Sequence, residues 1–389
     1  IFGLSEIKSI FQHRKHDIFI MLYVQFCIFV KLGINIIQNL FMSKKNLINH
    51  EIYMQRCFQL AKLGASFVAP NPMVGAVLVY NNTIIGEGYH QKFGAAHAEV
   101  NCINSVKEAD KPLIPLSTLY VSLEPCAHFG KTPPCSDLII QHKIPKVVIS
   151  IQDNFAAVNG KGIERLKAHG IEVITGILEK EGKELLKHFL HFHQYHRPYI
   201  TLKFAQTADG FLGIKNQEIA ISNELSKRYV HHLRAIHQGI LVGKNTILSD
   251  NPTLNVRCWN GKNPIKIVLG NPKNIPADYI IFNHPENTIF IYSTEKKLNI
   301  NEILDQLYQQ QIISVLVEGG ENVLQQFIQQ NAWDEAHIIT NNKRMKQVFH
   351  AQHTDFITAP ELSGKLVSTI NLENDHIQII KNIHAISHS

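Results

Sequence analysis

Apolar and polar residues follow one another along this chain in the order expected for alternating strands and helices. Short apolar runs typical of buried strands are separated by segments with apolar residues at helical spacing. In the first half the predicted strands are 73–80, with a turn at Asn81-Asn82, 118–123, 146–150 and 171–174, and the predicted helices are 47–63, one from about 97, one from about 134 and 161–169. This order predicts a mostly parallel sheet covered by helices.

The pattern is interrupted by the charged, polar stretch "LEKEGKELLKHFLHFHQYHRP" at 178–198, where we place a domain boundary. The alternation then starts again. The predicted strands are 199–204, 239–242, 265–269, 288–292 and 313–318, and the predicted helices are 223–236, 301–310 and one ending near 330. The chain is therefore predicted to hold two α/β domains, over residues 42–185 and 198–389.

Residues 1–41 are treated separately. They contain the uncharged run "IFIMLYVQFCIFV" at 18–30, and a second apolar run follows Lys31. Because "MSKKNLINHEIYMQRCFQLA" from Met42 resembles an ordinary start, we interpret 1–41 as an upstream extension outside the native protein. A membrane anchor is the alternative. A cleaved secretory signal is disfavoured, because no small-x-small cleavage site follows the run.

Composition narrows the class of protein. A length of 389 residues suggests at least two cores, and 45% hydrophobic with 18% charged residues is typical of a globular protein. The net charge of +6 permits an anionic small-molecule substrate but does not indicate a nucleic-acid surface. The six cysteines are scattered, which favours a reducing compartment such as the cytoplasm over a disulfide framework.

Two short motifs carry a candidate metal site, "HAEV" at 97–100 and "EPCAHFGKTPPC" at 124–135. His97, Cys126 and Cys135 suit a catalytic zinc ion, which takes three protein ligands and keeps one position open for water. Glu99 is then left to move protons between that water and a leaving nitrogen, as in zinc nucleobase deaminases. The alternatives are ordinary buried thiols beside a helix-start histidine, or a closed structural site with His128 as the fourth ligand.

A second histidine-rich stretch, "HFLHFHQYH" at 188–196, could be mistaken for a metal-binding tract. No cysteine or carboxylate is arranged around it in the sequence. We interpret it as a solvated linker helix.

The motifs together resemble one family. The nine-residue step from Cys126 to Cys135, with "PNPMVG" at 70–75, is similar to the bacterial bifunctional riboflavin-biosynthesis deaminase/reductases, the RibD-type proteins. The resemblance covers about 45–340 and continues in "LKFAQTADG" (202–210), "HLRA" (232–235), "VGKNTILSDNPTLNVR" (242–257) and "VEGG" (317–320). It implies a cytidine-deaminase-like three-layer α/β/α zinc domain followed by a dihydrofolate-reductase-like α/β domain.

The resemblance implies zinc-dependent deamination of 2,5-diamino-6-(5-phosphoribosylamino)pyrimidin-4-one, then NADPH-dependent reduction of the ribosyl group to ribityl. It also implies a cytoplasmic homo-oligomer with a small phosphorylated substrate and no nucleic-acid or membrane partner. One alternative is a tRNA adenosine deaminase with an accessory domain, which would show the short P-C-x-x-C spacing and a basic, aromatic-rich extension. Another is a zinc-stabilised scaffold without activity.

In the second half, Gly319-Gly320 ends a strand and opens a helix, so backbone N–H groups there could meet a phosphate. Arg234 and Arg257 suit a substrate 5′-phosphate, with surface ion pairs as the alternative. The resemblance implies NADPH contacts at Gln206, Ala220, Thr246, Asp250, Gly319 and Gly320. It implies substrate contacts at Asn71, Lys203, Glu218, Arg234, Leu254, Arg257 and Glu318. Two departures stand out, because Ala220 replaces an aromatic residue and the segment after 340 lacks the family's Pro/Leu/Gly-rich stretch.

Overall fold

The fold comes from a computed structural model, which describes residues 50–127, 133–153, 160–215, 217, 219–294, 298–348 and 355–384. The chain divides into two compact units, Ile1–Gln55 and Arg56–Ser389, and the second holds all the predicted strands of both α/β regions. The predictions for residues 1–41, His128 and Glu218 lie outside the described residues. In the part of the chain that the structure describes, no helix is both long and apolar enough to cross a membrane.

The N-terminal sheet has five strands in the order β2-β1-β3-β4-β5. Their bounds are β1 (Gly75–Tyr80), β2 (Thr83–Tyr89), β3 (Thr118–Leu123), β4 (Lys146–Ile151) and β5 (Glu172–Ile174). β1 runs antiparallel to β2 and β3, while β3, β4 and β5 are parallel. The turn predicted at Asn81-Asn82 is confirmed, because both residues have positive φ, as tight hairpin turns require.

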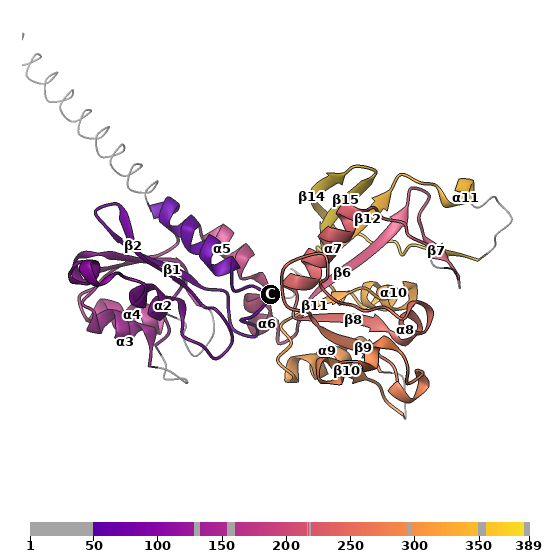
Figure 1. The fold of residues 1–389 in the computed structure, drawn as a ribbon, viewed down its shortest axis with the longest axis horizontal. Helices are drawn as coiled ribbons and strands as arrows, with labels where there is room; N and C mark the ends of the chain where they lie inside the picture. The colour runs from indigo at the N-terminus through magenta and orange to yellow at the C-terminus, as the bar shows by residue number, and fades with distance from the viewer. Residues whose placement is uncertain are drawn as a thin grey trace, which may run out of the picture. The chain divides into compact units, whose positions relative to one another are not determined.

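Helices cover both faces of this sheet (Figure 1). Ala76 and Leu78 of β1 pack in one core with residues of α2 (Ala98–Asn104), α3 (Cys135–Gln141) and α4 (Lys161–Ala168). On the other face, a helix over residues 50–62 approaches β1 so closely that a Cβ on Gly75 would lie 2.0 Å from the Cys57 carbonyl oxygen. The predicted three-layer α/β/α domain is confirmed.

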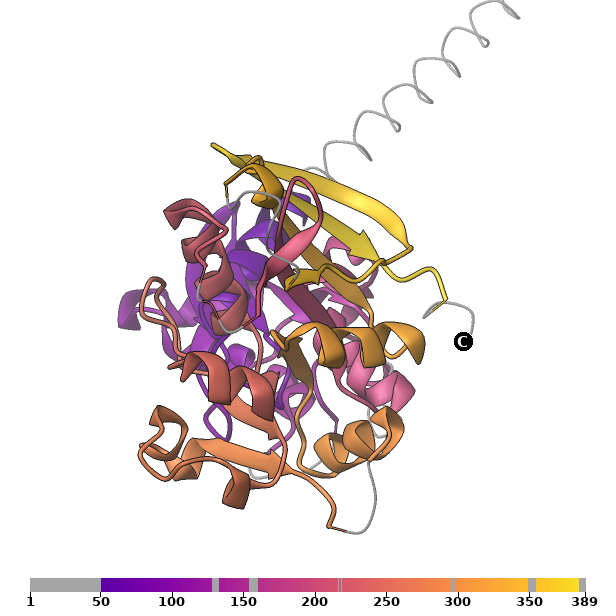
Figure 2. The ribbon, with the colours of Figure 1, turned by 90° about the vertical axis from the view of Figure 1, so that its right-hand side faces the viewer.

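The second sheet has eight strands in the order β10-β9-β8-β11-β6-β12-β15-β14. The strands from β10 to β12 are parallel, and β15 and β14 continue the sheet in antiparallel fashion. Figure 2 shows the orange β9 and β10 near one edge and the yellow β15 and β14 near the other. The bounds are β6 (Tyr199–Thr207), β8 (Gly239–Gly243), β9 (Ile265–Leu269), β10 (Thr288–Ile291), β11 (Ser314–Val317), β12 (Glu335–Asn341), β14 (Lys365–Leu372) and β15 (Asp375–Lys381); a separate pair is formed by β7 (Phe211–Ile214) and β13 (Phe356–Thr358).

This sheet is also covered on both faces. Leu307 of α9 (Ile300–Gln309) and Phe327 of α10 (Glu321–Gln329) belong to one core with Leu202 of β6. On the opposite side, Val230 of α7 (Glu224–Ile236) packs with Ile339 of β12. Apart from the segment between the two sheets, the structure describes further helical segments: α8 (Lys244–Asp250), α11 (Met345–Val348) and the 3₁₀ turns Glu108–Leu116, Pro272–Asn274, Ile280–Phe282 and Pro285–Asn287.

The segment between the two sheets forms α5 (Glu179–Leu185) and α6 (Lys187–Tyr195). The prediction that the histidine-rich helix is solvated is wrong. Phe189 and Phe192 are 8% and 1% exposed, and burial lowers the pKa of His188 well below its ordinary value. The sequence pattern was misleading because histidines counted as polar residues are here packed among aromatic side chains.

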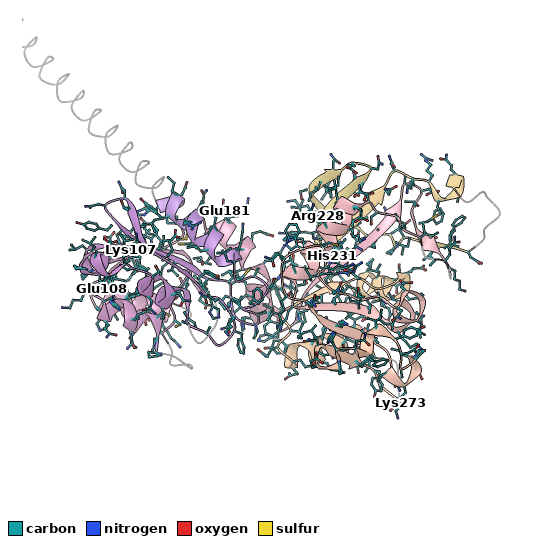
Figure 3. The ribbon with its side chains drawn as sticks, in the orientation of Figure 1. Lys107, Glu108, Glu181, Arg228, His231 and Lys273 are labelled. Atoms are coloured by element: carbon teal, nitrogen blue, oxygen red, sulfur yellow. The ribbon has the colours of Figure 1, made fainter. Side chains whose placement is uncertain are left out.

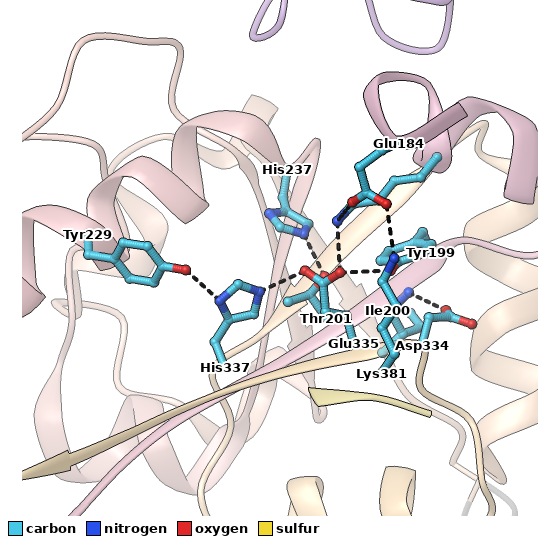
Figure 4. A network of polar contacts seen from close by, with 11 residues as sticks. Glu184, Tyr199, Ile200, Thr201, Tyr229, His237, Asp334, Glu335, His337 and Lys381 are labelled. Atoms are coloured by element: carbon cyan, nitrogen blue, oxygen red, sulfur yellow. Dashed lines mark hydrogen bonds and ion pairs between the residues drawn. The ribbon is translucent and has the colours of Figure 1, made fainter. Parts of the chain in front are cut away.

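α6 is tied to the second sheet by a buried polar network centred on Glu335 of β12 (Figure 4). The Glu335 carboxylate accepts hydrogen bonds from Lys187 Nζ at 2.8 Å, Tyr199 Oη at 3.1 Å and His337 Nε2 at 2.7 Å. With Nε2 donating, His337 Nδ1 accepts from the Tyr229 hydroxyl at 2.7 Å. A buried carboxylate is costly unless it is paired, and these donors provide the pairing.

Candidate active sites

The three predicted zinc ligands meet at one point although they come from three places in the chain. His97 is the N-cap of α2, Cys126 follows β3, and Cys135 is the first residue of α3. Their ligand atoms lie within 4.8 Å of one another, and His97 Nδ1 is 3.3 Å from Cys135 Sγ and 3.7 Å from Cys126 Sγ. Ligand atoms on one tetrahedral zinc ion are roughly 3.5–3.8 Å apart, so this donor set fits the metal.

The two cysteine thiols differ in how readily they lose a proton. Their mutual hydrogen bond lowers the pKa of Cys126 and raises the pKa of Cys135. The backbone N–H of Cys135 also donates to Cys126 Sγ at 3.3 Å, which stabilises negative charge on that sulfur. A divalent cation is what would stabilise both sulfurs as thiolates.

Glu99 lies in the first turn of α2, two residues from His97, and only 3% of its surface is exposed. Burial raises its pKa to about 7, and the negative charge of Cys126 adds to the effect. A carboxyl group that exchanges a proton near neutral pH is suited to general acid–base work.

His90, which the sequence analysis did not single out, lies beside the candidate zinc ligand His97. Its Nε2 is 3.1 Å from Asn71 Nδ2, its Nδ1 is 3.0 Å from the Ala96 carbonyl oxygen, and its ring stands 5.5 Å from the His97 ring. Because the histidine Nδ1–H donates to Ala96, Nε2 can accept from the Asn71 amide. The signal in the sequence was a histidine placed directly after the β2 strand and seven residues before a ligand.

In the second domain, a buried ion cluster forms where β11 ends. Arg234 donates from Nε to Glu318 Oε1 at 2.7 Å and from Nη2 to Oε2 at 3.0 Å, and Lys203 Nζ lies 3.5 Å from Oε2. Burial opposes ionisation of Glu318, but the charges of Lys203 and Arg234 outweigh it and lower its pKa to about 2. The Arg234 ion pair is therefore buried, not at the surface.

Arg234 and Arg257 meet at Asn255. Arg234 Nη1 donates to the Asn255 carbonyl oxygen at 3.2 Å, and Arg257 Nη1 donates to its side-chain oxygen at 3.0 Å and to Thr253 Oγ1 at 3.0 Å. The Arg257 side chain is exposed, whereas Arg234 is not. The structure thus brings the two predicted arginines together but leaves them with different surroundings.

The α7 helix brings two further side chains, Arg228 and His231, to this region. Arg228 and His231, both labelled in Figure 3, stand one turn apart, and His231 precedes Arg234 by one further turn. Burial lowers the pKa of His231 to about 4, and the positive charges of Arg234 and Arg257 contribute. An open depression beside them is lined by Arg228, Arg257, Cys258, Trp259 and Asn260.

Two of the predicted cofactor residues contact each other. Thr246 Oγ1 in α8 accepts a hydrogen bond from the Gly320 N–H at 3.2 Å, and Gly320 is the N-cap of α10 with no side-chain cap. A Cβ on Gly319 would lie 2.6 Å from Val323 Cβ. This uncapped helix start, which has no room for a side chain at Gly319, fits a phosphate group of NADPH.

The remaining residues predicted to contact the cofactor or the substrate come from several elements of the second domain. Asp250 ends α8, one turn beyond Thr246. Gln206 Nε2 donates to Thr340 Oγ1 on the neighbouring strand at 3.2 Å, and Ala220 is exposed. Leu254 has a buried side chain and a φ of 51°, so only its backbone is available to a ligand.

Each half of the chain matches the model of a known protein family. Residues 47–151 match the cytidine and deoxycytidylate deaminase zinc-binding region, and residues 198–343 match the RibD C-terminal domain. The riboflavin biosynthesis protein RibD of Aquifex aeolicus is 38% identical over 302 residues, covering 72% of this chain and 84% of the relative. RibD of Escherichia coli is 34% identical, covering 73% of this chain and 85% of the relative.

The chain belongs to the RibD family.

Solved structures agree with this assignment. A deaminase/reductase from Thermotoga maritima matches with a TM-score of 0.77 and 33% identity, covering 87% of this chain and 99% of that one. RibD of Acinetobacter baumannii gives a TM-score of 0.77 at 31% identity, covering 86% and 99%. This RibD chain is therefore a bifunctional enzyme of riboflavin biosynthesis, a zinc-dependent deaminase joined to an NADPH-dependent reductase. That conclusion replaces the tRNA deaminase and scaffold alternatives.

Proposed function

We propose that the first domain deaminates 2,5-diamino-6-(5-phosphoribosylamino)pyrimidin-4-one and that the second reduces the ribosyl group of the product to ribityl. The Thermotoga maritima protein is described as a diaminohydroxyphosphoribosylaminopyrimidine deaminase and 5-amino-6-(5-phosphoribosylamino)uracil reductase, which supports this substrate order. The observation that carries the proposal is a buried Glu99 beside three zinc-ligand atoms that lie within 4.8 Å of one another.

In the deaminase site, His97, Cys126 and Cys135 would hold zinc, which supplies Lewis-acid activation of a water molecule. Glu99 takes up the proton of that water at its carboxylate and returns it to the departing nitrogen. Because the Glu99 carboxyl group is buried beside the three ligand atoms, one and the same group can accept this proton and donate it again. Asn71 and His90 would hold the pyrimidine beside Glu99, a role that their mutual hydrogen bond supports.

In the reductase site, NADPH supplies the hydride, and its phosphates would lie at Gly319 and Gly320 with Thr246 and Asp250 nearby. Lys203 and Glu318 lie in the buried cluster and would face the reacting sugar. Arg257 is the exposed arginine of the pair and is better placed than Arg234 to contact the 5′-phosphate. The remaining contacts, Gln206 and Ala220 to the cofactor and Glu218 and Leu254 to the substrate, stay predictions.

We further propose that the enzyme is a cytoplasmic homo-oligomer that acts on this small phosphorylated molecule and needs no nucleic acid. The modest net charge of +6 supports a small anionic substrate over a polynucleotide.

The test is incubation of the full chain with the phosphorylated diaminopyrimidine, with and without NADPH, followed by mass spectrometry. Exchange of one amino group for oxygen is expected without NADPH, and a further gain of two hydrogens is expected with it. Glu99→Gln should slow the first change by about 10²–10⁴-fold but leave reduction of the pre-deaminated compound intact. Reduction of the diamino compound before deamination would contradict the proposed order.

A further inference from the structure

The carboxylate of Glu124 is buried directly beside the zinc-ligand loop and has no part in the chemistry described above. Only 4% of its surface is exposed. Oε1 accepts from the N–H groups of Gly162 at 2.9 Å and Ile163 at 3.2 Å, and Oε2 accepts from those of Asp153 at 3.1 Å and Gly160 at 3.1 Å. Four donors from the chain that leaves β4 and starts α4 therefore converge on one side chain.

The backbone of Glu124 and Pro125 also contacts β4 and α4. Its N–H donates to the Ile151 carbonyl oxygen at 2.9 Å, which extends the pairing of β3 with β4 by one residue. The start of α4 also lies against the next residue, because a Cβ on Gly162 would come within 2.0 Å of the Pro125 carbonyl oxygen. These contacts join β3, β4 and α4 at Glu124 and Pro125, and the next residue is Cys126.

Cys126 is held on its far side by the start of α3. Its carbonyl oxygen accepts from the Ser136 N–H at 3.1 Å, and its sulfur accepts from the Cys135 N–H. Metal ligands need their positions fixed to within about half an ångström, and the groups behind them provide this. Among the described residues on the Pro125 side of Cys126, Glu124 joins β3 to the start of α4 through four hydrogen bonds.

We propose that Glu124 is a positioning residue, which clamps the start of α4 to the end of β3 and so holds Cys126 where the zinc ion needs it. Four backbone N–H donors require an acceptor with two free oxygens, and only a carboxylate of this length provides both. A glutamine would present an NH₂ group to two of the four donors. An aspartate would keep the charge but be too short to reach all four.

The test compares Glu124→Gln with the control Glu164→Gln, in the full chain. Glu164 is an exposed glutamate in the first turn of α4. The zinc dissociation constant is measured by competition with a chelator, and amide hydrogen exchange is measured on the metal-free protein. Loss of a group that supports a metal ligand typically weakens metal binding about 10- to 100-fold. We expect this for Glu124→Gln, together with faster exchange at Asp153, Gly160, Gly162 and Ile163, and neither effect for the control.

A purely structural role would appear as faster exchange and a lower unfolding temperature with an unchanged zinc dissociation constant, and that result would overturn the proposal. Unchanged exchange at the four amides would overturn it too. Should Glu124→Gln fail to fold, Glu124→Asp provides the same comparison, with a smaller loss of zinc affinity expected because the charge is retained. These readouts need no substrate, so they are independent of which pyrimidine the enzyme deaminates.

Discussion

Replacing Arg234 by methionine should destabilise the reductase domain strongly. The side chains of Arg234 and Glu318 are only 13% and 8% exposed, and the guanidinium donates twice to the carboxylate. Removing one partner of a buried ion pair typically costs about 3–5 kcal/mol, because the other charge stays buried and unpaired. Lys203, 3.5 Å from the same carboxylate, retains part of the pairing, so we expect about 3 kcal/mol.

The assay is thermal or urea unfolding followed by tryptophan fluorescence. The two tryptophans, Trp259 and Trp333, both lie in the second domain, so the signal reports that domain alone. For a domain of this size, about 3 kcal/mol corresponds to a fall in Tm of roughly 6–12 °C. The matched control is Arg257→Met, whose side chain is exposed and which should change stability by less than about 0.5 kcal/mol.

A double variant separates the ion pair from other effects. Arg234→Met combined with Glu318→Leu removes both charges, so it should be more stable than Arg234→Met alone. If Arg234→Met unfolds like the wild type and only raises the KM for the phosphorylated substrate, Arg234 is a phosphate ligand and the buried pair contributes nothing to folding. The reasoning from burial would then be refuted.

Three further results are expected. Glu99→Gln should keep its zinc on metal analysis while deamination falls by about 10²–10⁴-fold, and loss of zinc would show that Glu99 is a ligand. Cys135→Ser should lose zinc and lower the stability of the first domain, since a hydroxyl is a poorer ligand than a thiolate; full zinc occupancy would point to another third ligand. Burial lowers the pKa of His237 from 6.5 to about 4. Between these two pH values the histidine is protonated in the unfolded chain but not in the folded one. The free energy of unfolding therefore falls as the pH drops from about 6.5 to about 4. Between pH 7.5 and 5 this one group should cost about 2 kcal/mol in the tryptophan-monitored transition, and an unchanged pH dependence in His237→Gln would contradict the assignment.

The sequence by itself predicted most of the strands and helices in both halves up to about residue 330, because each shows a clear apolar run or helical spacing. It also predicted the zinc ligands His97, Cys126 and Cys135, which lie in two short motifs, and the structure brings their ligand atoms within 4.8 Å of one another. The strands β2, β7, β12, β13, β14 and β15 were not predicted. Six of the eight residues of β14 are exposed, the first five of them in an unbroken run, so this edge strand carries no period-two signal.

Only the tertiary structure decided which charges meet. Arg234 and Glu318 are 84 residues apart, and Lys187 and Glu335 are 148 apart, so no local pattern connects either pair. Glu124 belongs to a motif that was recognised, but its four partners come from another strand end and helix start. Side-chain periodicity is fixed by backbone geometry within a few residues, whereas the pairing of buried charges depends on which strands become neighbours in the sheet. For this reason the sequence identified the metal site, while the supports around it became visible only in the fold.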